Sequence, residues 1–249
     1  MPGTDGPAVI RSTLRQQIAD ALRDEVLAGR LEPGQEFTVK EIAEQYGVSA
    51  TPVREALVNL TAQGLLDADQ HRGFHVHEHT LDDYRSMLEA RGLIADGIFR
   101  DLMAQGDARA ANARTASAPT GDATAPRDNT EALFAVRRRG EEAARAACAG
   151  DLTVLIGYDL RFWRELSALF GNAYLSDFLH RLRVKSWVCA VTHLRRWSDI
   201  NGGDLRGLLW SRHTELVDAL VRKDPEAAHG IVREYNAHSL SLIERLAAA

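Results

Sequence analysis

Apolar residues recur every three or four positions along most of this 249-residue chain, the spacing that places them on one face of an α-helix. This pattern predicts a first helix over residues 12–28, which ends at Gly29. The capping-box spacing of Thr38 and Glu41 predicts the start of a second helix, and Gly47 predicts its end. The apolar stripe of the first helix consists of Leu14, Ile18, Leu22 and Val26.

A third short helix is predicted to begin in the stretch Tyr46–Leu57, which reads YGVSATPVREAL. Ser49 is placed to cap this helix, and Pro52 falls in its first turn, where a missing N–H is tolerated. Thr51 and Arg54 lie three residues apart on the face opposite the apolar one, so both are predicted to point outward. The apolar face consists of Val53, Ala56, Leu57 and Leu60.

Two short strands are predicted after the third helix, over Leu65–Asp69 and Phe74–His79, joined by a turn at residues 70–73. Three helices followed by a β-hairpin are the elements of a winged helix-turn-helix. We therefore predict a winged helix-turn-helix domain over residues 12–79, preceded by a disordered tail over residues 1–11.

Beyond residue 80 the helical period continues to the end of the chain, which predicts an all-α domain over residues 81–249. Residues 106–130 contain almost no large apolar side chain and are predicted to form a flexible insertion. Asp224 and Pro225 supply a cap and a first-turn proline for one of the later helices. The predicted fold class is mainly α, with a small β-hairpin wing in the N-terminal domain and a helical bundle in the C-terminal domain.

Composition places the chain among ordinary folded proteins of the cytoplasm. No apolar run approaches membrane-spanning length, and residues 1–13 do not resemble a signal peptide. The two cysteines, Cys148 and Cys189, lack the Cys-x-x-Cys spacing and are expected to be free thiols in a reducing compartment. We therefore expect a cytoplasmic protein without a membrane partner.

The net charge of −5 does not by itself suggest a nucleic-acid partner. Residues 1–80 contain 7 Lys and Arg and 12 Asp and Glu, which accounts for the whole imbalance. A DNA-binding function therefore requires positive charge to gather on one face of the N-terminal domain, with the carboxylates turned away from it.

The outward face of the third helix has the side chains that a DNA-reading helix needs. Arg54 could reach guanine edges or phosphate, and Thr51 could reach phosphate or a thymine methyl group. Lys40 is placed for a phosphate at the start of the preceding helix. Arg72, at the predicted wing tip, could enter the minor groove, with Gly73 allowing close approach. The alternative is that these elements pack a core and the charges are simply solvated.

Four polar residues of the C-terminal region lie on otherwise apolar helix faces, where they cost free energy unless they find partners. They are Arg91, Asp159, His213 and His238. One carboxylate and two imidazoles that converge in a helical bundle could bind a divalent metal. Taken singly, each could equally be a core residue whose hydrogen bonds are satisfied within the protein.

The run from Leu31 to Val76 resembles the amino-terminal domain of GntR-family bacterial transcription regulators. The resemblance rests on GVS-x-TPVREAL, L-x-x-x-GLL and RG-x-x-V. It implies a homodimer that binds a palindromic double-stranded DNA operator. Where the family usually has an arginine that contacts bases, this chain has Ala50. The positions that match DNA-contacting ones are Lys40, Ser49, Thr51, Arg54, His71, Arg72 and Gly73.

Residues 81–249 resemble the FCD ligand-binding domain of the FadR subfamily of GntR regulators. Many of those domains bind a metal through one Asp and three His, beside a small carboxylate effector. Asp159, His213 and His238 fit this set, but Trp163 occupies the position of the histidine four residues after the Asp. Two alternatives follow: Zn, Mn or Ni bound by the three remaining ligands, or a cavity that binds the effector directly. We favour the second.

The resemblance also assigns the effector site. Arg91 fits the arginine that binds the effector carboxylate, and Ala95 stands where family members often have a glutamate. The expected effector-binding residues are Arg91, Asp159, Trp163, His213 and His238.

We therefore expect a ligand-responsive transcription regulator, a repressor rather than an enzyme. The first alternative is a metal-dependent enzyme with a two-His, one-carboxylate site in the helical domain. The second is a DNA-binding architectural protein without an effector.

Overall fold

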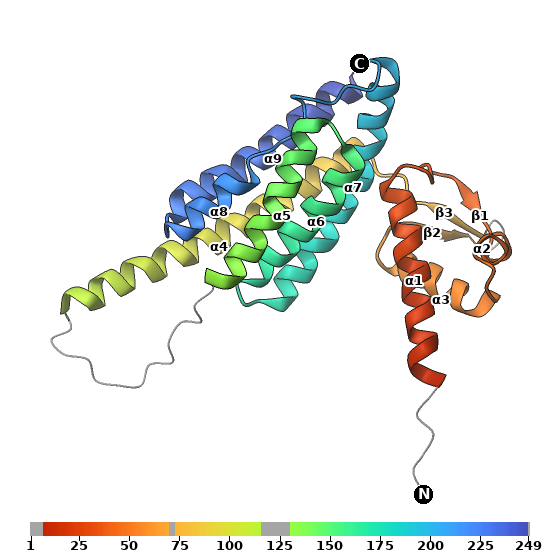
Figure 1. Cartoon of the computed structure of the whole chain (residues 1–249), viewed down its shortest axis with the longest axis horizontal. Helices are drawn as coiled ribbons and strands as arrows, with labels where there is room; N and C mark the ends of the chain where they lie inside the picture. The colour runs from red at the N-terminus through yellow and green to blue at the C-terminus, as the bar shows by residue number, and fades with distance from the viewer. Residues whose placement is uncertain (1–6, 70–72, 116–129, 249) are drawn as a thin grey trace, which may run out of the picture.

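The computed structural model describes residues 7–69, 73–115 and 130–248. It confirms a mainly α fold in two parts, a small N-terminal domain with a three-stranded sheet and a C-terminal bundle of long helices (Figure 1). No helix of the described residues is long and apolar enough to cross a membrane.

The N-terminal domain is a winged helix-turn-helix, as the sequence predicts. Its helices are α1 (Pro7–Leu27), α2 (Val39–Tyr46) and α3 (Ala50–Ala62), and its strands are β1 (Glu36–Phe37), β2 (Leu66–Asp69) and β3 (Gly73–Val76). The strands pair antiparallel in the order β1-β3-β2, so the predicted hairpin is the wing. The sequence reading missed β1, because two residues are too few to show the period of a strand.

Local chemistry sets the ends of the helices that form the helix-turn-helix. The Thr38 side chain accepts a hydrogen bond from the Glu41 amide, and the Glu41 carboxylate accepts one from the Thr38 amide. This capping box fixes the start of α2. Gly47 ends the same helix in the left-handed conformation, at φ +64°. The apolar face of α3 is fully buried, with Val53, Ala56 and Leu57 at 0% exposure.

The C-terminal bundle consists of α4 (Leu81–Thr115), α5 (Thr130–Ala149), α6 (Leu152–Ala168), α7 (Ala173–Ile200), α8 (His213–Val221) and α9 (Pro225–Ala247). Asp224 caps α9 ahead of its first-turn proline, as predicted. Within the bundle, α5 packs on α6 and α8, while α4 packs on α7 and α9. Figure 1 shows α4 and α9 running along each other.

Part of the stretch predicted as a flexible insertion, residues 106–130, is helical. Residues 106–115 continue α4 as helix, and residues 116–129 lie outside the described residues. The prediction of a flexible segment from residue 106 is therefore wrong for its first ten residues. A shortage of large apolar side chains does not weaken the helix propensity of the alanines and arginines in this stretch.

Helix α7 is where the bundle contacts the N-terminal domain (Figure 1). Buried residues of α7 belong to the same apolar cluster as the core of the winged domain. Two glycines of the winged domain lie directly under α7 side chains. A Cβ atom on Gly64 would lie 2.5 Å from Nζ of Lys185, and one on Gly29 would lie 2.6 Å from Cδ of Arg195. The two domains are therefore in close packing contact.

Candidate DNA-binding and effector sites

The outward face of α3 carries the predicted DNA-reading residues. Thr51 and Arg54 are exposed, on the side of the helix opposite the buried Val53. Ala50 is exposed at the first position of the helix. No described residue of the domain covers these three positions, so a helix inserted in a groove would present them to the bases.

Of the other residues predicted to contact DNA, three are described by the structure and two are not. Lys40 is exposed, and its Nζ lies 3.8 Å from Oε1 of Glu44 one turn later. Ser49 occupies the N-cap position of α3, but its hydroxyl makes no capping hydrogen bond. The sequence reading that Ser49 caps the helix through its side chain is therefore wrong, and the hydroxyl is free of that bond. His71 and Arg72 lie outside the described residues.

Gly73 has a structural reason for lacking a side chain. Its φ is +91°, and a Cβ atom would lie 2.8 Å from the carbonyl oxygen of Phe37 on the neighbouring strand. The glycine is therefore needed for strand pairing in the wing, independently of any contact with DNA.

The bundle core is organised around the carboxylate of Asp159, which is 1% exposed. Its Oδ1 accepts a hydrogen bond of 2.9 Å from the indole N–H of Trp163 and lies 3.0 Å from Nε2 of His213. Its Oδ2 accepts from the indole N–H of Trp187 at 2.7 Å and from the hydroxyl of Tyr235 at 3.5 Å. Four side chains from four helices thus converge on one buried carboxylate.

The pKa of Asp159 reflects this cluster. Burial raises the pKa, but the hydrogen bond with His213 and the positive charge of Arg183 more than offset it, so the pKa lies below its ordinary value. Asp159 is therefore an anion at neutral pH, held by donors of the protein itself.

The predicted metal ligands are only partly brought together. Asp159 and His213 meet, but Nε2 of His238 lies 2.8 Å from the carbonyl oxygen of Leu208. The indole of Trp163 has only an N–H donor to offer and cannot ligate a cation. Among the described residues, no group of three or more His, Cys, Asp and Glu side chains is placed to hold a metal ion. The residues present therefore do not fit the one-Asp, three-His metal site of the FCD domains that the bundle resembles.

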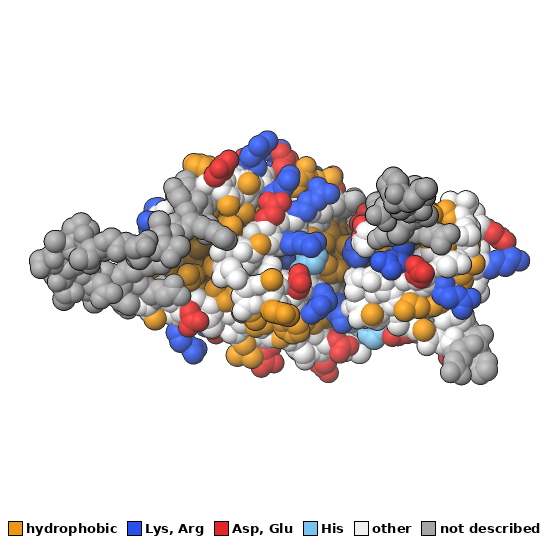
Figure 2. Space-filling model, turned by 90° about the horizontal axis from the view of Figure 1, so that it is seen from below, with side chains coloured by type: hydrophobic (Ala, Val, Ile, Leu, Met, Phe, Trp, Pro, Cys, Tyr) orange, Lys and Arg blue, Asp and Glu red, His pale blue; other side chains and the backbone are white. Residues whose placement is uncertain are grey.

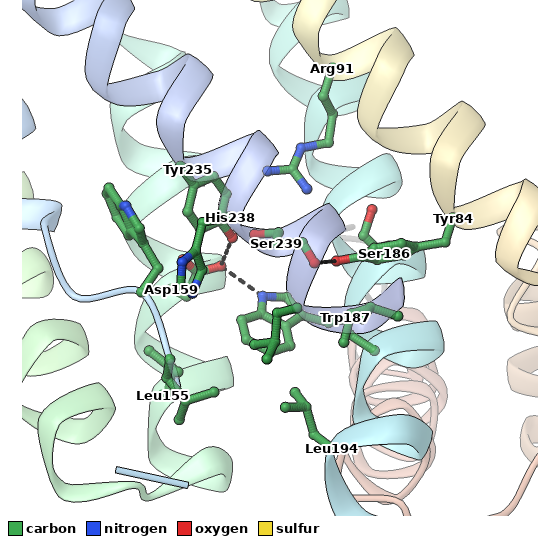
Figure 3. A pocket seen from close by; sticks show the side chains of 15 residues that line it. Tyr84, Arg91, Leu155, Asp159, Ser186, Trp187, Leu194, Tyr235, His238 and Ser239 are labelled. Atoms are coloured by element: carbon green, nitrogen blue, oxygen red, sulfur yellow. Dashed lines mark hydrogen bonds between the residues drawn. The ribbon is translucent and has the colours of Figure 1, made fainter. Parts of the chain in front are cut away.

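A central cavity of about 40 Å³ lies beside this cluster (Figure 3). Arg91, Asp159, Trp187, Tyr235 and His238 line it, and Figure 3 shows the Arg91 side chain extending into it from α4. Three of the five predicted effector residues, Arg91, Asp159 and His238, line this cavity. The other two, Trp163 and His213, contact Oδ1 of Asp159.

Sequence reasoning missed three residues of this region, Arg183, Trp187 and Tyr235. Tyr235 was visible as an inward position on the same helical stripe as His238. Arg183 and Trp187 lie four residues apart on α7, which marks one helix face but carries no known motif. Their convergence on Asp159 depends on how α6 and α7 pack.

A third feature is a cleft of about 320 Å³ between the two domains, lined by Arg23, Gln63, Arg164, His180 and Arg181 among others. Figure 2 shows basic side chains gathered around a histidine on the bundle face next to the N-terminal domain. Burial and the nearby charges of Arg164 and Arg23 lower the pKa of His180 to about 4, so it is neutral at physiological pH.

Two family models match the chain. The model "Bacterial regulatory proteins, gntR family" matches residues 14–76, and the model "FCD domain" matches residues 120–238. The first covers the winged domain, and the second covers most of the bundle.

Two of the relatives match over most of the chain. The "Uncharacterized HTH-type transcriptional regulator YdhC" of Bacillus subtilis is 32% identical over 85% of this chain and 83% of its own length. The "Probable D-xylose utilization operon transcriptional repressor" of Paenarthrobacter nicotinovorans is 29% identical over 88% of this chain and 83% of its own length. Two other relatives match over only 36% and 34% of their lengths.

A solved structure of E. coli McbR/YncC has the same fold, with a TM-score of 0.65 at 23% sequence identity. The similarity covers 93% of this chain and 97% of that one. These relatives are all named as transcription regulators, so the metal-dependent enzyme alternative has no support.

Proposed function

This chain belongs to the gntR family of bacterial regulatory proteins and is a DNA-binding transcription regulator with a ligand-binding FCD domain, and we propose that it is a repressor released from its operator by a small carboxylate. The observation that carries the effector half is Arg91, a buried arginine that extends into the central cavity beside Asp159. The proposal places the repressor in the cytoplasm, where its DNA is.

The DNA half of the proposal rests on α3. We infer that two copies of the chain form a homodimer and place their α3 helices in successive major grooves of a palindromic operator. Base reading falls on Arg54 and Thr51, because Ala50 has no polar group to contribute. We infer that Lys40 and the Ser49 hydroxyl contact phosphates on the flank of the helix.

The effector is proposed to bind without a metal. In family members with a metal, the cation would neutralise the central aspartate and attract the ligand carboxylate. Here, Trp163, Trp187, His213 and Tyr235 already surround the Asp159 carboxylate. Attraction of an anionic ligand therefore depends on arginine side chains.

Coupling between the sites is proposed to run through α7. One face of this helix lines the central cavity with Ser186 and Trp187. Another face contacts the winged domain through Lys185, at Gly64 near the end of α3. A ligand that moves α7 would therefore move the recognition helices of the dimer relative to each other and lower operator affinity.

Fluorescence anisotropy with DNA from upstream of the gene tests the DNA half. We expect saturable binding that weakens steeply as salt rises, because phosphate contacts release counterions. Arg54→Ala should weaken specific binding at least tenfold, whereas Arg30→Ala should change it less than threefold. Arg30 is a suitable control because it is an exposed arginine of the same domain that pairs with Glu25 away from α3.

The effector half is tested by titrating the protein–DNA complex with small carboxylates. At least one should release the DNA, and Arg91→Met should abolish the release while leaving operator affinity unchanged. Binding that is indifferent to salt and to Arg54→Ala would contradict the DNA-reading role of α3. Release that persists in Arg91→Met would contradict the effector site.

A further inference from the structure

A second cavity of about 50 Å³ lies on the other side of Arg91 from the central cavity. We call it the apolar cavity. Arg91 lines both cavities, so its side chain forms part of the boundary between them. The walls of the apolar cavity are largely aromatic and aliphatic, formed by Ile98, Phe99, Trp163, Leu166, Phe170 and Leu179. Arg91 and Arg183 are the charged residues of its lining, which also includes the polar Ser167, His180 and Asn236.

Both arginines are buried, at 3% and 6% exposure, and neither is fully hydrogen-bonded. Within the described part of the chain, Nε and Nη2 of Arg91 and Nη1 of Arg183 have no hydrogen-bond partner. The Arg183 guanidinium stacks on Trp163, with its central carbon 4.0 Å from the ring centre. The guanidinium carbons of both arginines lie 5.2 Å from the ring centre of Tyr235. Aromatic faces thus partly stabilise these cations, but they accept none of the free N–H groups.

Two buried positive charges with unsatisfied donors are costly, because each lost its water on folding. The nearby carboxylate of Asp159 supplies one negative charge, but its oxygens are occupied by Trp163, Trp187, His213 and Tyr235. One further negative charge would balance the cluster. A carboxylate has two oxygens and can accept from both guanidinium groups at once.

The apolar walls define the rest of the ligand. A fully polar anion would leave Phe99, Leu166 and Phe170 facing polar groups, whereas an aryl or alkyl body would bury apolar surface against them. A ligand that fills this cavity therefore has a charged end and an apolar body.

We propose that the effector is an amphipathic monocarboxylate, whose carboxylate binds between Arg91 and Arg183 and whose apolar body enters the apolar cavity. The free volume of about 50 Å³ is smaller than an aromatic ring requires, so the lining side chains move apart when the ligand binds. This inference rests on the proposed function for the role of the ligand as effector, but the binding site is defined independently of DNA. It refines the proposed function by placing the ligand on the other side of Arg91 from the central cavity and Asp159.

Isothermal titration with benzoate tests the charged and apolar requirements together. Benzoate should bind the full chain saturably and quench tryptophan fluorescence, since Trp163 lines the cavity. Acetate, which lacks the apolar body, should bind at least tenfold more weakly. Benzyl alcohol, which lacks the charge, should not bind detectably. Equal affinities for benzoate and benzyl alcohol would overturn the proposal.

Ala95 offers a matched pair of variants that test the position of the carboxylate. It lines the apolar cavity but not the central one, one helical turn from Arg91 on α4. Ala95→Glu places a carboxylate within reach of the arginines and should lower benzoate affinity at least tenfold relative to Ala95→Gln, which fills the same space without charge. Similar affinities of the two variants would place the ligand elsewhere.

Arg183→Met keeps most of the side-chain volume and removes the charge, so it should also lower benzoate affinity at least tenfold. Arg196→Met is the control, because Arg196 lies exposed on the same helix and lines neither cavity. Thermal unfolding and circular dichroism establish that each variant is folded. Unchanged affinity in a folded Arg183→Met would overturn the proposal.

The outcomes separate this inference from the proposed function. If succinate releases operator DNA and benzoate neither binds nor releases it, the apolar cavity is not the effector site, although the repressor function stands. If benzoate binds as described and no carboxylate affects DNA binding, the ligand class is right and the effector-controlled repressor is wrong.

Discussion

The indole N–H of Trp163 donates a 2.9 Å hydrogen bond to Asp159, one helical turn earlier on α6. In the metal-binding members that the bundle resembles, a histidine at this position and the aspartate bind the cation together. Replacing a lone pair by an N–H donor turns a metal ligand into a hydrogen-bond partner for the carboxylate. At this position of the helix, the side chain therefore stabilises the aspartate directly by donating a hydrogen bond, instead of sharing a metal ion with it.

We expect Trp163→His to increase metal affinity, because it adds a lone pair one turn from Asp159 and near His213. After dialysis against EDTA, the variant should bind Zn²⁺ at least tenfold more tightly than the unmodified protein, as measured by isothermal titration. Trp163→Phe removes the N–H without adding a ligand and should show no such increase. Stoichiometric metal that resists EDTA in the unmodified protein would contradict the metal-free site.

Ala50→Arg is expected to tighten operator binding or shift its sequence preference, since Ala50 is exposed at the start of α3. A bidentate arginine contact with guanine discriminates by about 1–3 kcal/mol, so the change should reach about tenfold on at least one sequence. Selection from a random-sequence DNA library, followed by anisotropy on the enriched sites, measures both effects. Ala50→Gln serves as the uncharged control. Indifference on every sequence would mean that this end of α3 does not face the groove.

Asp159→Asn should destabilise the protein by about 1–3 kcal/mol, because the amide cannot accept from all the donors around it and its NH2 group faces other N–H groups. Urea unfolding at neutral pH measures the difference. Asp177→Asn is the control, because Asp177 is exposed on α7.

The loss of stability in Asp159→Asn is expected to depend on pH. The pKa of Asp159 is lower in the folded protein than in the unfolded chain, where it is 3.8. The contribution of ionised Asp159 to the free energy of unfolding is therefore complete above about pH 4 and is lost as pH falls further. The stability difference between the protein and Asp159→Asn should stay constant from pH 7 to about pH 5 and shrink in acid. A difference that grows in acid would show that the carboxylate is not stabilised by its partners.

His180 should make the protein less stable as pH falls from about 6.5 to about 4. Its pKa in the folded protein is about 4, lower than the unfolded value of 6.5, so the unfolded chain binds the proton first. Stability is therefore complete above pH 6.5 and decreases toward pH 4. His180→Gln should flatten this decline in urea unfolding, and measurements at pH 8, where the imidazole is neutral in both states, provide the reference. Equal pH slopes would show that the interdomain cleft does not perturb His180.

The winged domain was predictable in detail because its signals are local. The Thr38–Glu41 spacing and Gly47 fix both ends of α2, and each acts within one helical turn. The two-residue strand β1 was not predicted, because it is defined by its pairing with β3 rather than by a pattern in its own residues.

The bundle core was predictable only as a set of inward-facing residues. Periodicity correctly indicated that Arg91, Asp159 and His213 are buried, but it carries no information on which helices meet. His238 also lies on the inner side of its helix, yet its imidazole contacts Leu208 rather than Asp159. The partners of a buried polar group depend on helix rotation by a fraction of a turn, which a sequence pattern does not specify.

The position of Lys185 on α7 determines what kind of motion can connect the domains. Lys185 follows Arg183 by two residues and precedes Trp187 by two, about 200° around the helix axis in each case. The cavity-facing and domain-facing side chains therefore share nearly the same height on the helix and point in opposite directions. In the proposed coupling, a twist of α7 about its own axis would move them in opposite senses at once, so the effect of a bound ligand would have to cross only the width of one helix.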